Sequence, residues 1–261
     1  MSADNKEFYD LLNSIANEQT FSLELSPRES EEITTVSCKQ LSTAQLKKLI
    51  ETVVDSPLTQ ASFNSTATRV FKESLVAKPS YPLNTIDRLL FILETRIQSL
   101  SPTMVTREDG EEVVINFKEV SEKLKQQLRE NQTLLRSSSA TEGKLTVNFG
   151  VALLDADTQL NEEIYKNINP NVEDADELRQ ILGDAFINEI AKSIQSITIG
   201  EKTLDLSTVT FKSRLKAIES LPASLIQQVI KHIEQYKKIL DDCSVVEGHT
   251  ITIDGSLFSL R

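Results

Sequence analysis

Apolar residues recur at helical spacing in several segments of the chain. Between residues 84 and 100 they form one stripe with a period of about 3.6 residues, which predicts an amphipathic helix. Phe91 and Ile92 fall outside that stripe, so we expect this helix to be packed on two sides, at the centre of the first half. The same spacing predicts helices over residues 118–135, 174–193 and 222–240, and one that carries Phe63, Val70, Phe71 and Leu75.

Short β-prone segments alternate with these helices. Three pairs of segments predict hairpins: 21–25 with 33–38, 104–107 with 113–117, and 197–199 with 204–206. The second pair flanks Asp109-Gly110, which supplies the positive φ values of a tight hairpin turn. Apolar residues alternate from Leu145 to Val151 and predict a strand with one buried face, and residues 250–253 predict a last strand.

The helix that follows the first hairpin has a strong start signal. Ser42 and Gln45 form a capping box, in which each side chain satisfies a backbone N–H of the first turn. Leu41 is placed to pack against Leu46. We expect this helix to end near Pro57.

The chain divides into two predicted halves. Residues 137–143 are small and polar, which is typical of a flexible linker. We therefore predict an N-terminal helical half with hairpins over 1–138 and a C-terminal α+β half over 139–261. The predicted fold class is α+β, with amphipathic helices interleaved with short antiparallel hairpins.

Composition and charge narrow the class of protein. The 261 residues are 39% apolar, too apolar for a disordered tail, and no apolar run reaches the roughly 18 residues of a membrane span. The formal net charge of −11 disfavours nucleic acid as a partner. The N-terminus lacks the pattern of a secretory signal, so we expect a cytoplasmic product with Cys38 and Cys243 reduced.

One segment begins like a calcium-binding loop. Asp155-x-Asp157-x-Gln159 has the right first positions, but Leu160 replaces the glycine of the sharp turn and Lys166 replaces the bidentate carboxylate. We interpret this segment as a solvated acidic loop.

The sequence contains no motif of a common enzyme class. His232, Cys243 and His249 are three conceivable zinc ligands, but their spacing matches no common zinc motif. We expect His232 to be a hydrogen-bonded, partly buried residue of its helix. Neither a nucleophile elbow nor a phosphate-binding glycine loop is present. We predict no catalytic residue, no metal site and no cofactor; the alternative is an enzyme whose pocket gathers His232 or His249 with carboxylates.

A DNA-associated protein is a second alternative. The nearest approach to a basic strip consists of Lys118, Lys123, Lys125 and Arg129, and glutamates interrupt it. A solvated helix with paired charges is the better interpretation of this pattern.

The chain is apolar almost to its last residue. We expect Ile251 and Ile253 to pair into the domain as a strand, and Gly255 to mark a turn after it. The apolar residues beyond this turn either dock on the protein's own core or extend toward a partner. These candidate partner-binding residues are Leu257, Phe258 and Leu260.

Four runs of residues resemble one known family. They are TTVSCKQLSTAQLKKLIE, LNTIDRLLFILETRIQSLSPT, IESLPASLIQQVIKHIEQYKKI and the terminal IDGSLFSL. On these runs the sequence resembles the baseplate hub subunit and hub assembly family of T-even-type contractile-tailed bacteriophages. The resemblance extends over most of both halves.

This resemblance implies a non-enzymatic role in building the central hub of the baseplate, either as a hub component or as an assembly chaperone. The implied partners are other hub proteins or the tape-measure protein, without nucleic acid or membrane. The implied location is the host cytoplasm during assembly, and the virion for a hub component. The matching runs are mostly helix cores, so they assign no binding residue, and the oligomeric state stays open.

Overall fold

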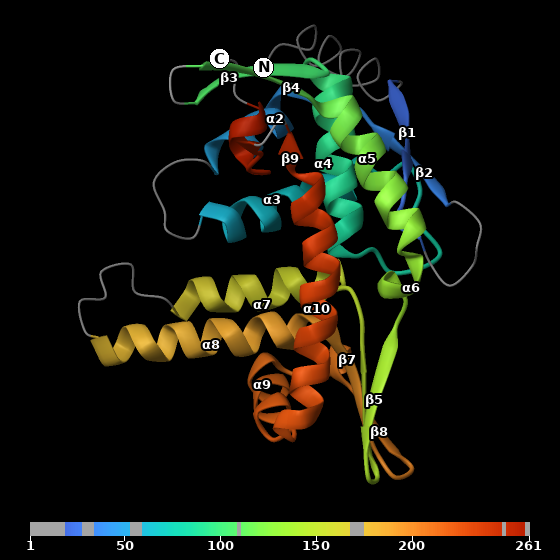
Figure 1. The fold of residues 1–261 in the computed structure, drawn as a ribbon, viewed down its shortest axis with the longest axis vertical. Coiled ribbons are helices and arrows are strands. Elements are labelled where there is room, and N and C mark those ends of the chain that lie inside the picture. Colours follow the sequence, from blue (N-terminus) through green and yellow to red (C-terminus); the bar gives the residue numbers. More distant parts are fainter. Residues whose placement is uncertain are drawn as a thin grey trace, which may run out of the picture.

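The computed structural model describes residues 19–27, 34–52, 59–108, 111–167, 175–246 and 249–258. These residues form the predicted α+β fold, in which helices pack with antiparallel sheets. The long helix α10 (Ala223–Cys243) runs along the middle of the molecule, and the hairpins lie toward its two ends (Figure 1).

The first part of the chain contains two hairpins and five helices among the described residues. In chain order they are β1 (Thr20–Glu24), β2 (Thr35–Lys39), α2 (Thr43–Glu51), α3 (Thr59–Ser74), α4 (Thr85–Ser99), β3 (Thr103–Glu108), β4 (Glu111–Asn116), α5 (Phe117–Glu130) and α6 (Gln132–Leu135). Strands β1 and β2 pair antiparallel, as do β3 and β4, so both hairpins predicted here are confirmed. The turn residues Asp109 and Gly110 lie outside the described residues. Helix α2 ends at Glu51, earlier than the predicted end near Pro57.

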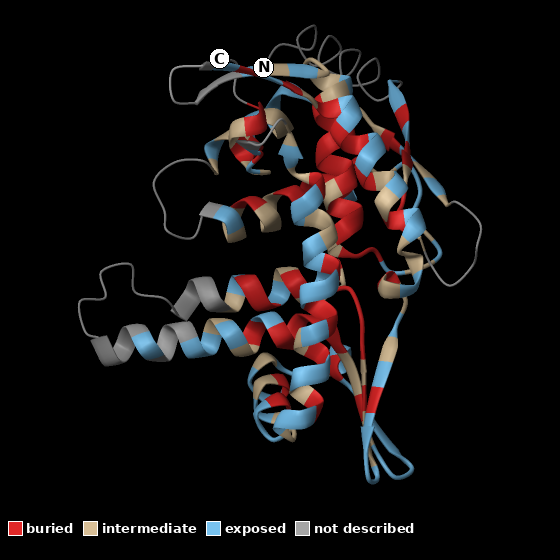
Figure 2. Ribbon diagram, viewed as in Figure 1, coloured by how far each residue is buried: buried red, intermediate tan, exposed pale blue. Residues whose placement is uncertain are grey.

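Helix α4 lies at the centre of this part of the chain, as predicted. It contacts α3, α5, α7 and β1, and most of its length is buried (Figure 2). The ring of Phe91 stacks on that of Phe71, with centroids 4.5 Å apart, and on that of Phe21, with centroids 6.4 Å apart. The side-chain oxygen of Asn84 accepts two backbone N–H groups of the first turn and thereby fixes the start of the helix.

The second part of the chain is a four-stranded antiparallel sheet with helices packed on it. Its elements are β5 (Ser138–Glu142), β6 (Leu145–Phe149), α7 (Leu154–Asn167), α8 (Ala175–Ser193), β7 (Ile194–Ile199), β8 (Lys202–Asp205), a 3-10 turn η1 (Leu206–Thr208), α9 (Phe211–Glu219) and α10. The strand order is β5-β6-β7-β8, so β5 and β8 are the edges. This sheet confirms the hairpin predicted around residues 200–202 and the strand predicted from Leu145.

The prediction of a flexible linker over residues 137–143 is wrong. Residues Ser138–Glu142 form β5, which pairs along its whole length with β6. Ala140 is buried, and Gly143 has a φ of 61°, the conformation that a tight turn into β6 requires. The small polar residues of this edge strand therefore have the same composition as a flexible linker. The boundary between residues 138 and 139 itself stays a prediction.

Several contacts join the two parts of the chain. Helix α10 packs against both α5 and α8. The backbone N–H of Thr85 donates to the carbonyl of Ala152, and that of Leu154 donates to the carbonyl of Leu83. The buried apolar residues of both parts belong to one continuous core.

Other predicted elements differ from the structure at their ends or in kind. The helix expected over 118–135 is divided into α5 and α6 at Asn131. Helices α7 and α9 were not predicted. The strand expected over 250–253 is wrong beyond Thr250, because only Val245–Val246 (β9) and His249–Thr250 (β10) pair there. The chain then forms a 3-10 turn, η2 (Gly255–Phe258).

The capping box of α2 is present as predicted. The Ser42 hydroxyl accepts from the backbone N–H of Gln45 at 3.3 Å, and the Gln45 side chain accepts from the backbone N–H of Ser42 at 3.0 Å. Replacing Ser42 by alanine should therefore lower the free energy of unfolding by about 1 kcal/mol, the usual effect of a lost cap. Urea unfolding measures this change, and an unaltered midpoint would contradict it.

The helices of the described segments are all too short or too polar to cross a bilayer.

Candidate functional site: a polar pocket between the two parts of the chain

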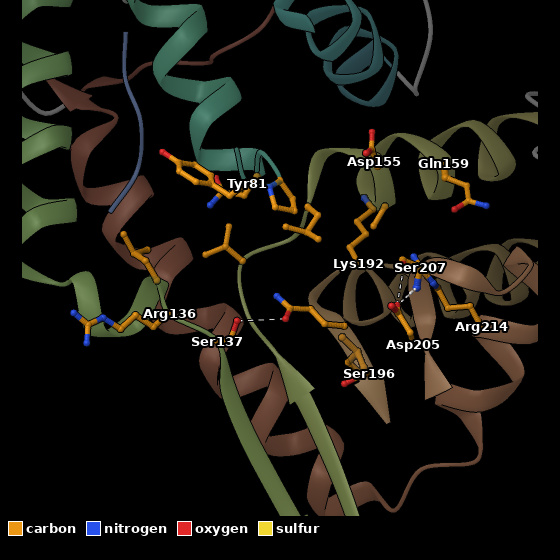
Figure 3. Close-up of a pocket in the computed structure, with 18 of the residues that line it drawn as sticks. Tyr81, Arg136, Ser137, Asp155, Gln159, Lys192, Ser196, Asp205, Ser207 and Arg214 are labelled. Atoms are coloured by element: carbon orange, nitrogen blue, oxygen red, sulfur yellow. Dashed lines mark hydrogen bonds between the residues drawn. The ribbon is translucent and has the colours of Figure 1, made fainter. Parts of the chain in front are cut away.

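A cavity of about 900 Å³ lies where the two parts of the chain meet. Tyr81 from the segment before α4 lines one side, Arg136 and Ser137 before β5 line another, and Asp155 from α7 lines a third (Figure 3). The remaining side is formed by β7, β8, η1 and α9, which contribute Ser196, Thr203, Asp205, Ser207 and Arg214. The pocket is therefore assembled from segments that are far apart in the sequence.

Three charged side chains meet in the interior beside this pocket. Asp157 of α7, Arg88 of α4 and Lys192 of α8 are each less than a tenth exposed. An oxygen of Asp157 lies 2.5 Å from Arg88 Nη1, and its other oxygen lies 3.3 Å from Lys192 Nζ. Burial alone would raise the pKa of Asp157, but the two cations and their hydrogen bonds outweigh it and hold that pKa below its ordinary value. The carboxylate is therefore ionised and joins three helices.

The interpretation of residues 155–159 as a solvated acidic loop is wrong, because these residues belong to α7. Asp155 and Asp157 lie two residues apart and point to different surroundings. The Asp155 side chain is 86% exposed and pairs with Lys72 on α3, whereas Asp157 is buried in the ion cluster. The aspartates act as structural ion-pair partners between helices.

Arg214 of α9 is a buried cation at the other end of the pocket. It is 3% exposed, and its Nε and Nη2 atoms donate to the backbone carbonyl of Leu206, with Nε at 3.1 Å. Its Nη1 atom has no hydrogen-bond partner among the described residues. Burial lowers the pKa of the guanidinium, and the negative charge of Asp205 partly opposes this effect. The site therefore contains a desolvated cation with a free donor.

Asp205 lies beside Arg214 and Ser207 in the pocket wall (Figure 3). Its carboxylate caps η1 by accepting from the Ser207 hydroxyl at 2.7 Å and from the Ser207 backbone N–H at 2.8 Å. These hydrogen bonds hold the pKa of Asp205 below its ordinary value.

One face of the four-stranded sheet carries two complete rows of short polar side chains. Each row crosses all four strands in the order β5, β6, β7, β8; the rows are Thr141, Thr146, Thr198, Thr203 and Ser139, Asn148, Ser196, Asp205. Hydroxyl pairs link β5 to β6 and β7 to β8 within the threonine row, at 3.0 and 2.9 Å. Thr203, Ser196 and Asp205 also line the pocket, so the polar face continues into it.

The histidines do not line this pocket in the described part of the chain. His232 on α10 is buried in the protein core. Its ring is edge-on to those of Phe149 and Tyr236, at centroid distances of 5.3 and 5.9 Å. Burial lowers its pKa, and Nε2 has no hydrogen-bond partner among the described residues, contrary to the expected hydrogen bond. The side chain of His249 lies outside the described residues.

Both cysteines are buried free thiols. Burial raises the pKa of Cys38 to about 12, which keeps its thiol protonated at neutral pH. Within the described ranges no three His, Cys, Asp or Glu side chains are grouped closely enough to hold a metal ion.

The predicted extension of the chain end toward a partner is not what the structure contains for Leu257 and Phe258. Both side chains are 1% exposed and belong to the core, and η2 packs against α2. Burial of apolar side chains of this size in the protein's own core is favourable, because it removes their surface from water. A free extension would leave that surface exposed. Leu260 lies outside the described residues.

Exposed apolar side chains occur instead on the hairpins, on helix α8 and in the segment after α3. Val105 of β3 and Val114 of β4 are directly opposite each other in the register, and each is 52% exposed. The other described exposed apolar side chains of large size are Val76, Phe186, Ile199, Leu204 and Val245.

No family model matches the chain, and the searches of curated proteins and of solved structures gave no match either.

The pocket residues were missed in the sequence because no motif contains them. The one available signal for Arg214 was the apolar spacing of Phe211, Leu215 and Ile218, which is typical of a helix and places Arg214 on its inner side. Nothing in the sequence signals that β8 and α7 border the same cavity.

Proposed function

We propose that this protein acts without catalysis in assembling the baseplate hub of a contractile-tailed bacteriophage, as a hub component or as an assembly chaperone. Its partners are other hub proteins or the tape-measure protein, and it works in the host cytoplasm during assembly. The resemblance of four runs of residues to the baseplate hub family suggests that the protein takes part in hub assembly. The observation that supports a binding role is the exposed valine pair on the β3–β4 hairpin, Val105 and Val114, called here the valine pair.

The β3–β4 hairpin has two different faces. Val113 and Ile115 are buried on one face, and the valine pair lies on the opposite one because side chains alternate along a strand. The hairpin is a sheet of two strands only, so both of its edges lack a neighbouring strand among the described residues. An apolar surface beside open strand edges is typical of a surface that binds another protein.

The test is a double variant, Val105→Thr with Val114→Thr. Threonine keeps the β-branched shape that strands favour but removes the apolar surface. We expect an unchanged melting temperature and loss of co-purification with hub or tape-measure proteins from phage-infected cells. Val76→Thr is the matched control, because Val76 is exposed to the same degree, at 53%, and lies outside the hairpin. Retained co-purification of the double variant would contradict the proposed role of this hairpin.

The two forms of the proposal differ in the finished particle. A hub component remains in the virion, whereas an assembly chaperone is present only in precursors. Mass spectrometry of purified virions beside immature tails distinguishes them. Absence of the protein from both preparations would contradict the proposed function altogether.

A further inference from the structure

The stretch of sequence around Arg214 is cationic although the whole chain is acidic. The chain has a formal net charge of −11. Between residues 192 and 216, however, the sequence has two carboxylates, Glu201 and Asp205, against five cations: Lys192, Lys202, Lys212, Arg214 and Lys216. Lys202, Lys212 and Lys216 are exposed, so this stretch is an accessible cationic region on an acidic protein. Such a local excess attracts anionic partners and orients their approach.

Buried cations are normally paired, because an unpaired charge in the interior is strongly unfavourable. Arg88 and Lys192 follow this rule through Asp157. Arg214 does not: Nε and Nη2 both donate to the backbone carbonyl of Leu206, and Nη1 is left without a hydrogen-bond partner in the described structure. Asp205 is close enough to affect the pKa of Arg214, but its carboxylate already accepts hydrogen bonds from Ser207. The free donor at Nη1 therefore suits a carboxylate from outside.

Strand β8 borders the pocket and is an open edge of the sheet. It is the last strand in the order β5-β6-β7-β8, and all four of its residues are exposed. The other edge, β5, is contacted by α10. Thr203 and Asp205 on β8 also line the pocket, so a segment added along this edge would run directly past Arg214.

We propose that the pocket and the open edge of β8 bind an extended acidic segment of a partner protein, with one of its carboxylates on Arg214 Nη1. The backbone of the segment pairs with β8 as a fifth strand, and its acidic side chains on the opposite face of the sheet from Asp205 lie on the same face as Lys202. Addition of a strand at a sheet edge is a common mode of peptide recognition, in which the backbone gives affinity and the side-chain pockets give specificity.

A peptide fits this site better than a small anion or a nucleic acid. The cavity of about 900 Å³ is larger than one carboxylate requires, and Pro82, Leu135 and Ile194 supply apolar surface for neighbouring side chains. A phosphate backbone would instead carry a charge at every nucleotide past Asp155 and Asp205, which line the same pocket. The pocket lies where the two parts of the chain meet, whereas the valine pair is on the β3–β4 hairpin at one end of the molecule, so the pocket is tested separately from the proposed hub role (Figure 1).

The probe is a fluorescent peptide of alternating glutamate and threonine, and binding is measured by anisotropy at low salt. We expect the wild-type protein to bind this peptide, and Arg214→Met to bind it about tenfold more weakly or worse, since a charge-assisted hydrogen bond is lost. Arg69→Met is the matched control, because Arg69 is an exposed arginine on α3 that does not line the pocket. Equal binding by Arg214→Met and the wild type would overturn the proposal.

A second variant keeps the test valid if Arg214→Met fails to fold. Asp205→Asn retains the oxygen that caps η1 but removes the negative charge beside Arg214. It should bind the acidic peptide several-fold more tightly than the wild type, whereas a general loss of structure would weaken binding. Unchanged or weaker binding by folded Asp205→Asn, shown by an unaltered circular dichroism spectrum, would overturn the proposal.

Further probes separate the alternatives. An acidic peptide with prolines at alternate positions cannot pair with a strand edge and should bind much more weakly. Citrate and an oligothymidylate, each added at the same total charge as the acidic peptide, should displace the fluorescent peptide only weakly. Equal binding of the proline peptide would overturn strand addition, and equal competition by citrate or oligothymidylate would overturn the peptide in favour of a small carboxylate or a nucleic acid.

Discussion

Replacing Asp157 by asparagine should lower the free energy of unfolding by about 3–5 kcal/mol, because it leaves the buried cations Arg88 and Lys192 without their counter-charge. Removal of one member of a buried pair has this large effect since the remaining charges stay desolvated. Lys192 keeps Glu189, and Arg88 keeps the Thr68 hydroxyl at 3.0 Å, but neither replaces the shared carboxylate. Urea unfolding at neutral pH, with midpoint and slope both fitted, measures the loss.

The same helix provides the control for this prediction. Asp155→Asn removes a carboxylate that also pairs across helices, with Lys72, but its side chain is 86% exposed. An exposed pair contributes roughly 0–1 kcal/mol, so this variant should unfold near the wild-type midpoint. Equal losses for Asp155→Asn and Asp157→Asn would show that burial of the cluster does not determine its contribution.

The pH dependence gives an independent check on Asp157. Its pKa is held below the ordinary value of 3.8 in the folded protein, so the folded state binds this proton less readily than the unfolded chain. The stabilisation is therefore present above about pH 4 and is lost as the pH falls toward the folded-state pKa. The difference in stability between wild type and Asp157→Asn should narrow in acid. A difference that is constant down to low pH would contradict ionisation of Asp157.

The elements that the sequence predicted correctly are those with local signals. The stripe of α4 and the capping box of α2 each depend on residues within a few positions of one another, and the paired segments of β1–β2 and β7–β8 are close along the chain. Such patterns reflect the geometry of one helix or one hairpin. The α+β class follows from their alternation.

The wrong predictions concern segments whose composition is compatible with two different structures. The small polar residues 137–143 are typical of a linker, but residues 138–142 form the polar edge strand β5, because Thr146 and Asn148 on its partner β6 carry matching short side chains. The acidic start of α7 is typical of a solvated loop, but Asp157 meets Arg88 and Lys192 from other parts of the chain. Only the tertiary structure reveals such partners. The pocket around Arg214 could not be predicted for the same reason.

The chain end was an apolar segment with two open interpretations, and the structure distinguishes them for Phe258. Its side chain is 1% exposed within the core, beside α2. The backbone just before η2 is also held, since Gln60 Nε2 donates to the Ile253 carbonyl at 3.2 Å. Phe258 therefore belongs to the interior of the protein, and its contribution should appear in stability without any partner.

Replacing Phe258 by alanine should lower the free energy of unfolding by about 3–5 kcal/mol, the usual effect of removing a buried aromatic ring and leaving a cavity. Phe186→Ala is the matched control: Phe186 on α8 is 54% exposed, so the same change there should stay within roughly 0.5 kcal/mol of the wild type. Thermal unfolding of the purified protein measures both. If the chain end were an anchor for a partner, Phe258→Ala would instead leave the melting temperature unchanged and abolish co-purification, because its contacts would exist only in the complex. Co-purification of Phe258→Ala with its partners should therefore decrease only in proportion to the folded fraction of the variant. At low temperature, where the variant is still folded, its binding should equal that of the wild type.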